Sequence, residues 1–408
     1  MGYLKDTIKG VTWVGAYRAS SRLIAFAKTA ILARILLPAQ FGIFGIAGLV
    51  QSLLETLTQT GINIFLVQEE DDVDSYIDTA WVVSIARGIL IALTIIILTP
   101  FIASFFRVPE ARNILFLTSL VPLLRGFINP AIAKFQKELK FDKEFRFKLP
   151  IYITESVVAV VLALLTRDAS SFIWGMIAGV IVEILLSFVV VRPVPKFSFE
   201  AIKIKRVVNR GKWVTAFGVF DYLFQNLDDF TVGRFLGKSP LGIYQVAYKI
   251  SSLPISEVAD VFSRVTFPVF RKISNDKKRL KKAFVKTALG TSALVIPFGA
   301  AIFLFSEQIV LILLGNNWLA AVPVLKVLSL YGIIRGIFYP MMAVFLALQK
   351  QQYVTVVTLV GILGLGLSII PLVNRFGIVG AGISTLVGSL ATAPVIIYYL
   401  LKIFKETK

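Results

Sequence analysis

The sequence contains no cysteine and no histidine, and only 16% of its 408 residues are charged. Without these two residue types the chain cannot use disulfide bonds, thiol nucleophiles, imidazole bases or Cys/His metal sites, and we expect neither a metal nor a cofactor. Hydrophobic residues make up 57% of the chain and the mean hydropathy is +0.80. A soluble domain of this size cannot bury so much apolar surface. The composition therefore predicts that a lipid bilayer surrounds much of the chain.

Twelve apolar runs are long enough to cross a bilayer, which takes about 20 helical residues. The sequence therefore predicts an all-α integral membrane protein with about twelve transmembrane helices, six in each half. The longest run is expected to hold a helical extension besides its span. The expected spans lie near residues 12–34, 41–67, 79–100, 113–133, 149–166, 171–191, 213–236, 241–266, 284–306, 319–348, 353–373 and 378–401.

One stretch of the sequence occurs twice. Residues 33–52, ARILLPAQFGIFGIAGLVQS, return 200 positions later as GRFLGKSPLGIYQVAYKISS. Farther along, at an offset of 210, Arg125-Gly126 is matched by Arg335-Gly336. A duplicated unit of about half the chain is typical of membrane transporters. We therefore expect two similar six-helix lobes joined by a basic cytoplasmic linker. Their expected bounds are 1–192 for the first lobe, 193–212 for the linker and 213–408 for the second lobe.

The basic residues between the expected spans are distributed unevenly. With the N-terminus inside, the cytoplasmic segments hold about four times as many Lys and Arg as the outer ones. An acidic run between Glu69 and Asp78 also falls inside, but acidic residues contribute little to this rule. Both termini are therefore expected in the cytoplasm of a multi-pass plasma (inner) membrane protein. The net charge of +19 is better explained by anionic lipid headgroups than by nucleic acid.

Two glycine patterns resemble nucleotide-binding motifs without meeting their requirements. GRFLGKS places three residues between Gly233 and Gly237 where a phosphate-binding loop has four, and it ends an apolar helix. Gly361, Gly364 and Gly366 follow no strand. Small residues that let membrane helices approach closely are the better interpretation, as for Gly175 and Gly179.

Several ionisable residues fall inside the expected spans, where they are costly and usually line a wet cavity. The first span carries Arg18, Arg22 and Lys28 on one face, and the third and fourth add Arg87 and Arg125. Polar stripes accompany them on the first two helices of the second half and on the second helix of the first half. Their members include Gln51, Glu55, Gln59, Asp221, Gln225, Asp228, Asp229, Gln245, Lys249 and Asp260.

Simpler explanations exist for some of these charges. Arg18 can extend to the inner surface, and Asp228 and Asp229 can neutralise Arg234. Arg125 and Arg335 are as readily structural anchors as functional groups, and the isolated Glu155 and Glu183 are better explained by interhelical hydrogen bonds. Extension to the surface does not explain Arg22, Lys28, Arg87 and Lys249, which lie well within spans. We therefore expect both halves to line a shared cavity with their first two helices.

Three segments carry a family resemblance. They are AILARILLPAQFGIFGIAG from Ala30, AKFQKELKF from Ala133, and QNLDDFTVGRFLGKSPLGIYQVAYK from Gln225. Their order resembles the polysaccharide transporter family, the Wzx-type flippases of lipid-linked oligosaccharides. This family shares a superfamily with the lipid II flippases and the multidrug and toxic compound extrusion transporters. The stretch from Ser20 to Lys28 also resembles the Ser-Arg…Arg-Asp pattern of lipid II flippases, but Lys28 and Thr29 replace Arg-Asp.

The resemblance implies two six-helix lobes around a central cavity, alternating access by rocking of the lobes, and no enzymatic activity. The implied substrate is a polyprenyl-pyrophosphate-linked oligosaccharide for surface polysaccharide biosynthesis. Lys and Arg in a wet cavity can replace the hydration of the pyrophosphate. We expect a monomer whose partners are the lipid-linked oligosaccharide and the membrane lipids. The expected substrate-binding residues are Arg18, Arg22, Lys28, Arg87, Lys249, Gln51 and Gln245, and the candidates for a coupling H⁺ or Na⁺ are Glu55, Asp221 and Asp228.

Rival functions predict other features. A cation-coupled multidrug antiporter of the same fold would have an acidic, aromatic-lined cavity, whereas the in-span charges here are mostly basic. A lipid II flippase would retain the Arg-Asp pair. A membrane enzyme such as a glycan polymerase would need a large outer loop with catalytic residues, and the expected outer loops are short. A purely structural protein would have no use for buried cations.

Overall fold

The computed structural model describes residues 2–58, 74–198, 200, 218, 222–223 and 225–405. Side chains are not described for residues 2–12, 253–254 and 256–265. All regular structure in the described part is helical. The chain forms two compact units, Met1–Asn226 and Leu227–Lys408, each of which is treated by itself below. The expected linker, 193–212, lies largely outside the described residues, so its bounds stay a prediction.

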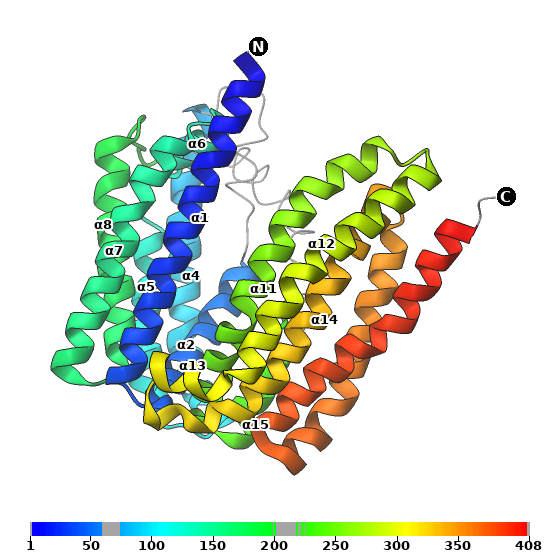
Figure 1. Ribbon diagram of the computed structural model, residues 1–408. Coiled ribbons are helices and arrows are strands. Elements are labelled where there is room, and N and C mark those ends of the chain that lie inside the picture. The colour runs from blue at the N-terminus through cyan, green and yellow to red at the C-terminus, as the bar shows by residue number, and fades with distance from the viewer. Residues whose placement is uncertain are drawn as a thin grey trace. The chain divides into compact units, whose positions relative to one another are not determined.

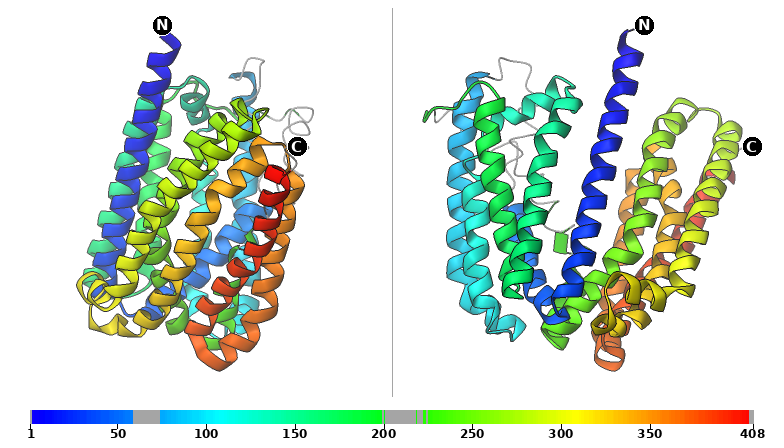
Figure 2. Two further views of the ribbon diagram at one scale, coloured as in Figure 1. Left: turned by 45° about the vertical axis from the view of Figure 1, so that its right-hand side comes forward. Right: turned by 60° about the vertical axis from the view of Figure 1, so that its left-hand side comes forward.

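The first unit packs helices from the N-terminal half side by side (Figures 1 and 2). Its strongest contacts join α7 to α8, α4 to α5 and α1 to α7. Glycines allow these close approaches, because an added Cβ on Gly88 of α4 would lie 2.6 Å from the carbonyl oxygen of Pro122 in α5. The elements are α1 (Gly2–Ile35), α2 (Pro38–Leu57), α4 (Asp74–Phe106), α5 (Ala111–Arg125), η1 (Pro130–Ile132), α6 (Ala133–Lys137), α7 (Phe141–Thr166) and α8 (Ser170–Val190).

A bend interrupts the fourth expected span, 113–133. Helix α5 ends at Arg125, and the chain turns by 69° before it continues through η1 and α6. Buried Asn129 fixes the bend through two hydrogen bonds. Its side-chain Oδ1 accepts from the backbone N–H of Ala131 at 2.9 Å, and its backbone N–H donates to Ser187 Oγ at 3.1 Å. Pro130 at the first position of η1 has no N–H to leave unsatisfied. The hydropathy of this run predicted a membrane span but gave no indication of the bend.

The second unit begins with the short helix α10 (Leu227–Leu236), which continues across Gly237 into α11 (Lys238–Lys272). Helix α14 packs against α11, α12 and α15. Gly377, with φ of 59°, breaks α15 between the two expected spans 353–373 and 378–401. The expected run 319–348 covers the end of η2 and all of α14. The remaining elements are α12 (Lys277–Leu304), α13 (Ser306–Leu313), η2 (Asn316–Ala321), α14 (Val322–Ala347) and α15 (Gln351–Lys405).

The repeated sequence has the same local structure in both units. In the first unit α1 ends at Ile35 and α2 starts at Pro38; in the second, α10 ends at Leu236 and α11 starts at Lys238. The two copies of the repeat thus cover the same helix, tight turn and helix. Both in-frame arginines, Arg34 and Arg234, lie in the last turn of the first helix, where a cation is favourable for the helix dipole.

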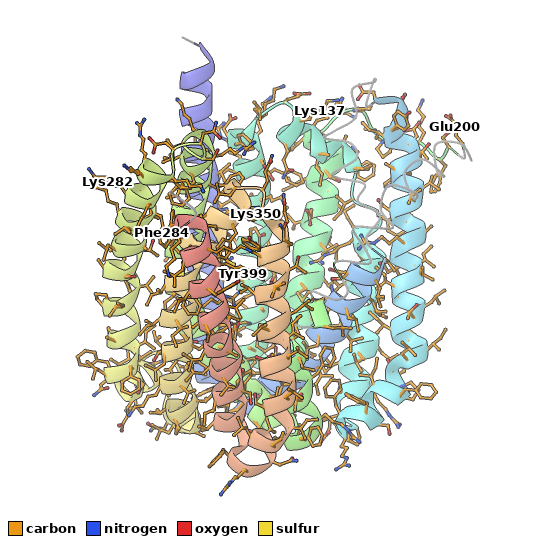
Figure 3. All side chains as sticks on the ribbon, turned by 90° about the vertical axis from the view of Figure 1, so that its right-hand side faces the viewer. Lys137, Glu200, Lys282, Phe284, Lys350 and Tyr399 are labelled. Atoms are coloured by element: carbon orange, nitrogen blue, oxygen red, sulfur yellow. The ribbon has the colours of Figure 1, made fainter. Side chains whose placement is uncertain are left out.

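An aromatic cluster lies at one end of the second unit (Figure 3). Tyr353 stacks on Tyr399 with ring centroids 3.9 Å apart, and Phe284 stacks on Phe404 at 5.9 Å. The ammonium of Lys350 lies 5.8 Å from the Tyr353 ring. Aromatic rings with basic neighbours are typical of the membrane–water interface.

Seven of the described helices are long and apolar enough to cross a membrane, and the bent pair of α5 with η1–α6 adds an eighth candidate. The protein is therefore a multi-pass, all-helical membrane protein. The end of the second expected span and most of 213–226 lie outside the described residues.

Candidate functional site

Lys28 is paired with an acid from another helix. Its Nζ on α1 lies 2.5 Å from Oε1 of Glu155 on α7, and about a fifth of each side chain is exposed. Gly179 of α8 makes room for this carboxylate, since an added Cβ would lie 3.1 Å from Cβ of Glu155. The expected interhelical bond of Glu155 is confirmed, and its partner is a candidate substrate ligand.

The rest of α1 lies along α7 through aromatic side chains. Tyr17 and Tyr152 share a hydrogen bond of 3.0 Å between their hydroxyls, and the Trp13 and Phe145 rings are 5.5 Å apart. On the same helix Arg18 is half-buried and Arg22 is exposed. The sequence pattern identified the two arginines as candidate site residues. It did not predict these aromatic contacts, which hold α1 against α7.

Glu55 of α2 is the centre of a second polar group in the first unit. Its Oε1 accepts from Nε2 of Gln51 and from Nη1 of Arg125, each at 2.9 Å. Arg87 of α4 donates from Nη2 to the backbone oxygen of Glu55 at 2.8 Å and from Nε to Thr58 Oγ1 at 3.1 Å. The guanidinium of Arg87 thus satisfies the C-terminal end of α2, whose last carbonyls have no helical partner. The structure brings together three of the expected site residues, Gln51, Glu55 and Arg87, around an arginine that had no assigned role.

In the second unit an acidic pair lies against tyrosine and glutamine. Buried Asp228 of α10 accepts a 2.7 Å hydrogen bond from the Tyr244 hydroxyl on α11. Its neighbour Asp229 bonds to Gln245, also on α11. Asp221 and the side chain of Asp260 lie outside the described residues.

Basic residues of the second unit lie on the same helices. Lys249, one turn beyond Gln245, is exposed and within electrostatic range of Asp229. On α14, Arg335 donates from Nη1 to the hydroxyls of Tyr331 at 3.0 Å and Tyr248 at 3.2 Å. These tyrosines could not be predicted as site residues, because a tyrosine in an apolar helix gives no separate signal.

The two units therefore offer different chemistry. The first combines Lys28, Arg87 and Arg125 with carboxylates, and the second combines Lys249 and Arg335 with phenols and an acidic pair. Charged donors of this kind bind phosphate and carboxylate oxygens, while amides and hydroxyls bind sugar hydroxyls. Within the described residues no group of acidic side chains could hold a metal ion.

The fold is similar to that of two solved transporters. The chain matches the lipid II flippase MurJ, in an inward closed conformation, with a TM-score of 0.75 over 97% of this chain and 89% of the other, at 16% identity. It matches an inward-facing multidrug resistance MATE family transporter with a TM-score of 0.70 over 95% and 96% of the two chains, at 15% identity. At these identities the likeness establishes the fold alone.

Relatives and a protein family match more closely in sequence. The lipopolysaccharide biosynthesis protein WzxC of Escherichia coli (strain K12) is 24% identical over 85% of this chain and 71% of its own length. The succinoglycan biosynthesis transport protein ExoT of Rhizobium meliloti is 27% identical over 82% and 67%. The family described as polysaccharide biosynthesis protein matches residues 31–323, well over half of the sequence. The resemblance expected from the three segments is confirmed, and the chain belongs to the polysaccharide biosynthesis protein family.

Proposed function

We propose that the protein is a flippase that moves a polyprenyl-pyrophosphate-linked oligosaccharide across the plasma membrane by alternating access, for surface polysaccharide biosynthesis. The family membership and relatives named for lipopolysaccharide and succinoglycan biosynthesis support this substrate class. The observation that carries the proposal is the set of cations on the helices of the proposed spans, above all Lys28 with its partner Glu155. A cation held by a movable counter-ion can exchange that partner for a phosphate oxygen.

The pyrophosphate must cross about 30 Å of hydrocarbon, where the loss of hydration is the main barrier. In this proposal Arg22, Lys28 and Lys249 bind the pyrophosphate, and Arg18 and Arg87 guide its entry. Gln51 and Gln245 contact the glycan, and the polyprenyl tail stays in lipid. Arg87 also holds the end of α2, so its entry role would accompany a structural one.

The architecture that fits this mechanism has twelve spans in two lobes, with both termini in the cytoplasm and a monomer as the working unit. The proposed lobes are residues 1–192 and 213–408, joined by the basic segment 193–212. The break at Gly377 and the tight turn before α11 support the helix order of the second lobe.

A coupling ion, H⁺ or Na⁺, would bind a carboxylate on a spanning helix. The proposed candidates are Glu55, Asp221 and Asp228. Glu55 is already paired with Arg125, and Asp228 with the Tyr244 hydroxyl, so an ion at either must compete with an existing contact.

The test is glycan export in a strain that lacks its own flippase and is complemented with this chain. Arg22→Ala, Lys28→Ala and Lys249→Ala each remove a charge-assisted contact and are expected to weaken substrate binding about tenfold to a hundredfold. Lys282→Ala, at the exposed start of α12, is the matched control and should export normally. Wild-type export by all three well-expressed site variants would contradict the proposed site. No export by the wild-type chain with any polyprenyl-linked glycan would contradict the function.

A further inference from the structure

Arg335 is held in an unusual way for a cation on a membrane helix. Its two hydrogen bonds, to the Tyr331 and Tyr248 hydroxyls, both come from Nη1. The two tyrosine rings lie 6.1 Å apart, and the guanidinium carbon is 5.9 Å from the Tyr331 ring centre. Among the described residues no carboxylate is within ion-pair distance of it; Asp228 affects it only through space, with one carboxylate oxygen bonded to Tyr244. Among the described side chains, two hydroxyls therefore orient the Arg335 guanidinium and no acid neutralises it.

The open part of this guanidinium has a specific shape. With Nη1 bound, Nε and Nη2 form the side edge of the group, whose two parallel N–H bonds match the two oxygens of a phosphate or carboxylate. Arg87 shows how such an edge is used: its Nε and Nη2 donate to Thr58 Oγ1 and the Glu55 carbonyl. In Arg335 the same edge has no partner among the described residues, and the side chain is exposed.

The internal repeat supplies a comparison. Arg125 occupies the matching position of the first unit, 210 residues earlier. There the guanidinium contacts Glu55 at 2.9 Å, which neutralises its charge. The same arginine of the duplicated sequence thus contacts an acid in one unit and two neutral phenols in the other.

The depth of Arg335 within its helix makes a charge without an acidic partner energetically costly. It follows the start of α14 by 13 residues, about 20 Å along the helix, which is the middle of a span. An uncompensated cation at that depth is expensive unless its face is wet. Gly332 and Gly336 let α14 pack closely on Ile255 of α11 and Val295 of α12, so the helix that bears Arg335 is fixed in place. A costly, exposed and pre-oriented cation is the arrangement expected of a binding group.

We propose that Arg335, oriented by Tyr248 and Tyr331, binds an oxyanion of the transported substrate through its Nε and Nη2 edge, and that Arg125 is its structural counterpart. This inference rests on the proposed flippase function. The oxyanion is a phosphate of the lipid carrier or the carboxylate of an acidic sugar, two sources with the same chemistry.

The test compares arginine variants of the full chain in lipid nanodiscs. Two probes separate the sources: a sugar-free polyprenyl pyrophosphate and a lipid-free oligosaccharide of glucuronic acid, each titrated by native mass spectrometry. Arg335→Gln is expected to weaken the bound probe about tenfold to a hundredfold. Arg335→Lys should weaken it nearly as much, because an ammonium cannot present two parallel donors. Arg125→Gln should bind the probe normally and unfold at a lower temperature.

Tyr331→Phe keeps the charge and removes one orienting hydroxyl, so it should bind several-fold more weakly while folding normally. It also provides a readout if Arg335→Gln is poorly folded. Wild-type affinity for both probes in Arg335→Lys and Tyr331→Phe would overturn the inference and leave the flippase function standing. A wild-type protein that binds neither probe and exports no glycan would contradict both.

Discussion

The cations inside the first unit differ in what holds them. Lys28 meets a carboxylate from α7, Arg125 meets one from α2, and Arg87 binds the end of α2 itself. An ion pair removed from water is costly to form, and removing one partner leaves the other charge uncompensated. The free energy of unfolding should therefore fall more when one member of such a pair is replaced than when both members are replaced.

Glu155→Gln leaves the Lys28 ammonium without its carboxylate. We expect the free energy of unfolding to fall by roughly 1–3 kcal/mol, less than for a fully buried pair because each side chain keeps about a fifth of its surface exposed. The double variant Lys28→Met with Glu155→Gln should recover most of this loss, since no buried charge is left over. Thermal unfolding in detergent measures both, with Glu307→Gln at an exposed position as control. Equal destabilisation by the single and double variants would show that the pair is not the cause.

The placement of the charged residues on their helices could be predicted from the sequence, whereas their interaction partners could not. Helical spacing places Arg18, Arg22 and Lys28 on α1, but Glu155 lies 127 residues away from Lys28. Only the packing of α1 on α7 brings them together. Likewise nothing in the local sequence around Glu55 reveals that its carboxylate accepts a hydrogen bond from Arg125, 70 residues on.

At the scale of the helices, small residues decide which pairs pack closely. An added Cβ on Gly175 of α8 would lie 2.6 Å from the carbonyl oxygen of Glu155 and 2.7 Å from Cβ of Ala159, both on α7. The interpretation of Gly175, Gly179, Gly361 and Gly364 as close-packing residues is confirmed. Gly366 differs, because nothing lies within 4 Å of its added Cβ. The sequence shows the same residue type at all five positions and cannot tell them apart.

Gly175→Ala and Gly366→Ala therefore form a matched pair. Gly175→Ala should lower the free energy of unfolding by about 1–3 kcal/mol, because the backbone of α7 has to move to admit the methyl group. Gly366→Ala adds a methyl group to open space and should leave stability unchanged or slightly raised, since alanine is the better helix former. Unfolding temperatures in the same detergent give the comparison. A tolerated Gly175→Ala would mean that α7 and α8 are less tightly packed than described.

Helix ends were predictable where the chain itself marks them. Gly377 divides α15 between two apolar runs, and the repeat marks the turns before α2 and α11. The 69° bend after α5 was not predictable from hydropathy, because it depends on a hydrogen bond that Asn129 accepts from the backbone N–H of Ala131 and on one that it donates to Ser187. An apolar run gives the length of a span but not its caps.

For the whole molecule, two helices that carry proposed substrate-binding charges are not identified as membrane spans by their hydropathy. Helices α1 and α11 are not among the seven that qualify as spans by length and hydropathy. They carry Arg18, Arg22 and Lys28 on α1 and Lys249 on α11, the charges proposed to bind substrate. The proposed twelve-span topology therefore depends most on the two helices with the weakest hydropathy signal.

The topology can be tested directly because the chain has no cysteine of its own. Helix α11 has 35 residues and is about 52 Å long, enough to cross about 30 Å of hydrocarbon and place its ends on opposite sides. The basic residues around the α11–α12 turn predict that this end lies in the cytoplasm. Single cysteines at Ser239→Cys and Asn316→Cys should therefore react with a membrane-impermeant maleimide in intact cells.

Asn275→Cys, in the turn between α11 and α12, should stay unlabelled in intact cells and react once the membrane is permeabilised. Permeabilisation shows that the cysteine is reactive, so that protection reports its side of the membrane. Because Ser239 and Asn275 are expected on opposite sides of the membrane, their cysteine variants should give opposite labelling results in intact cells. Labelling of Asn275→Cys in intact cells together with protection of Ser239→Cys would invert the proposed topology. Labelling of both in intact cells would mean that α11 does not span the membrane, which would remove Lys249 from any transport path.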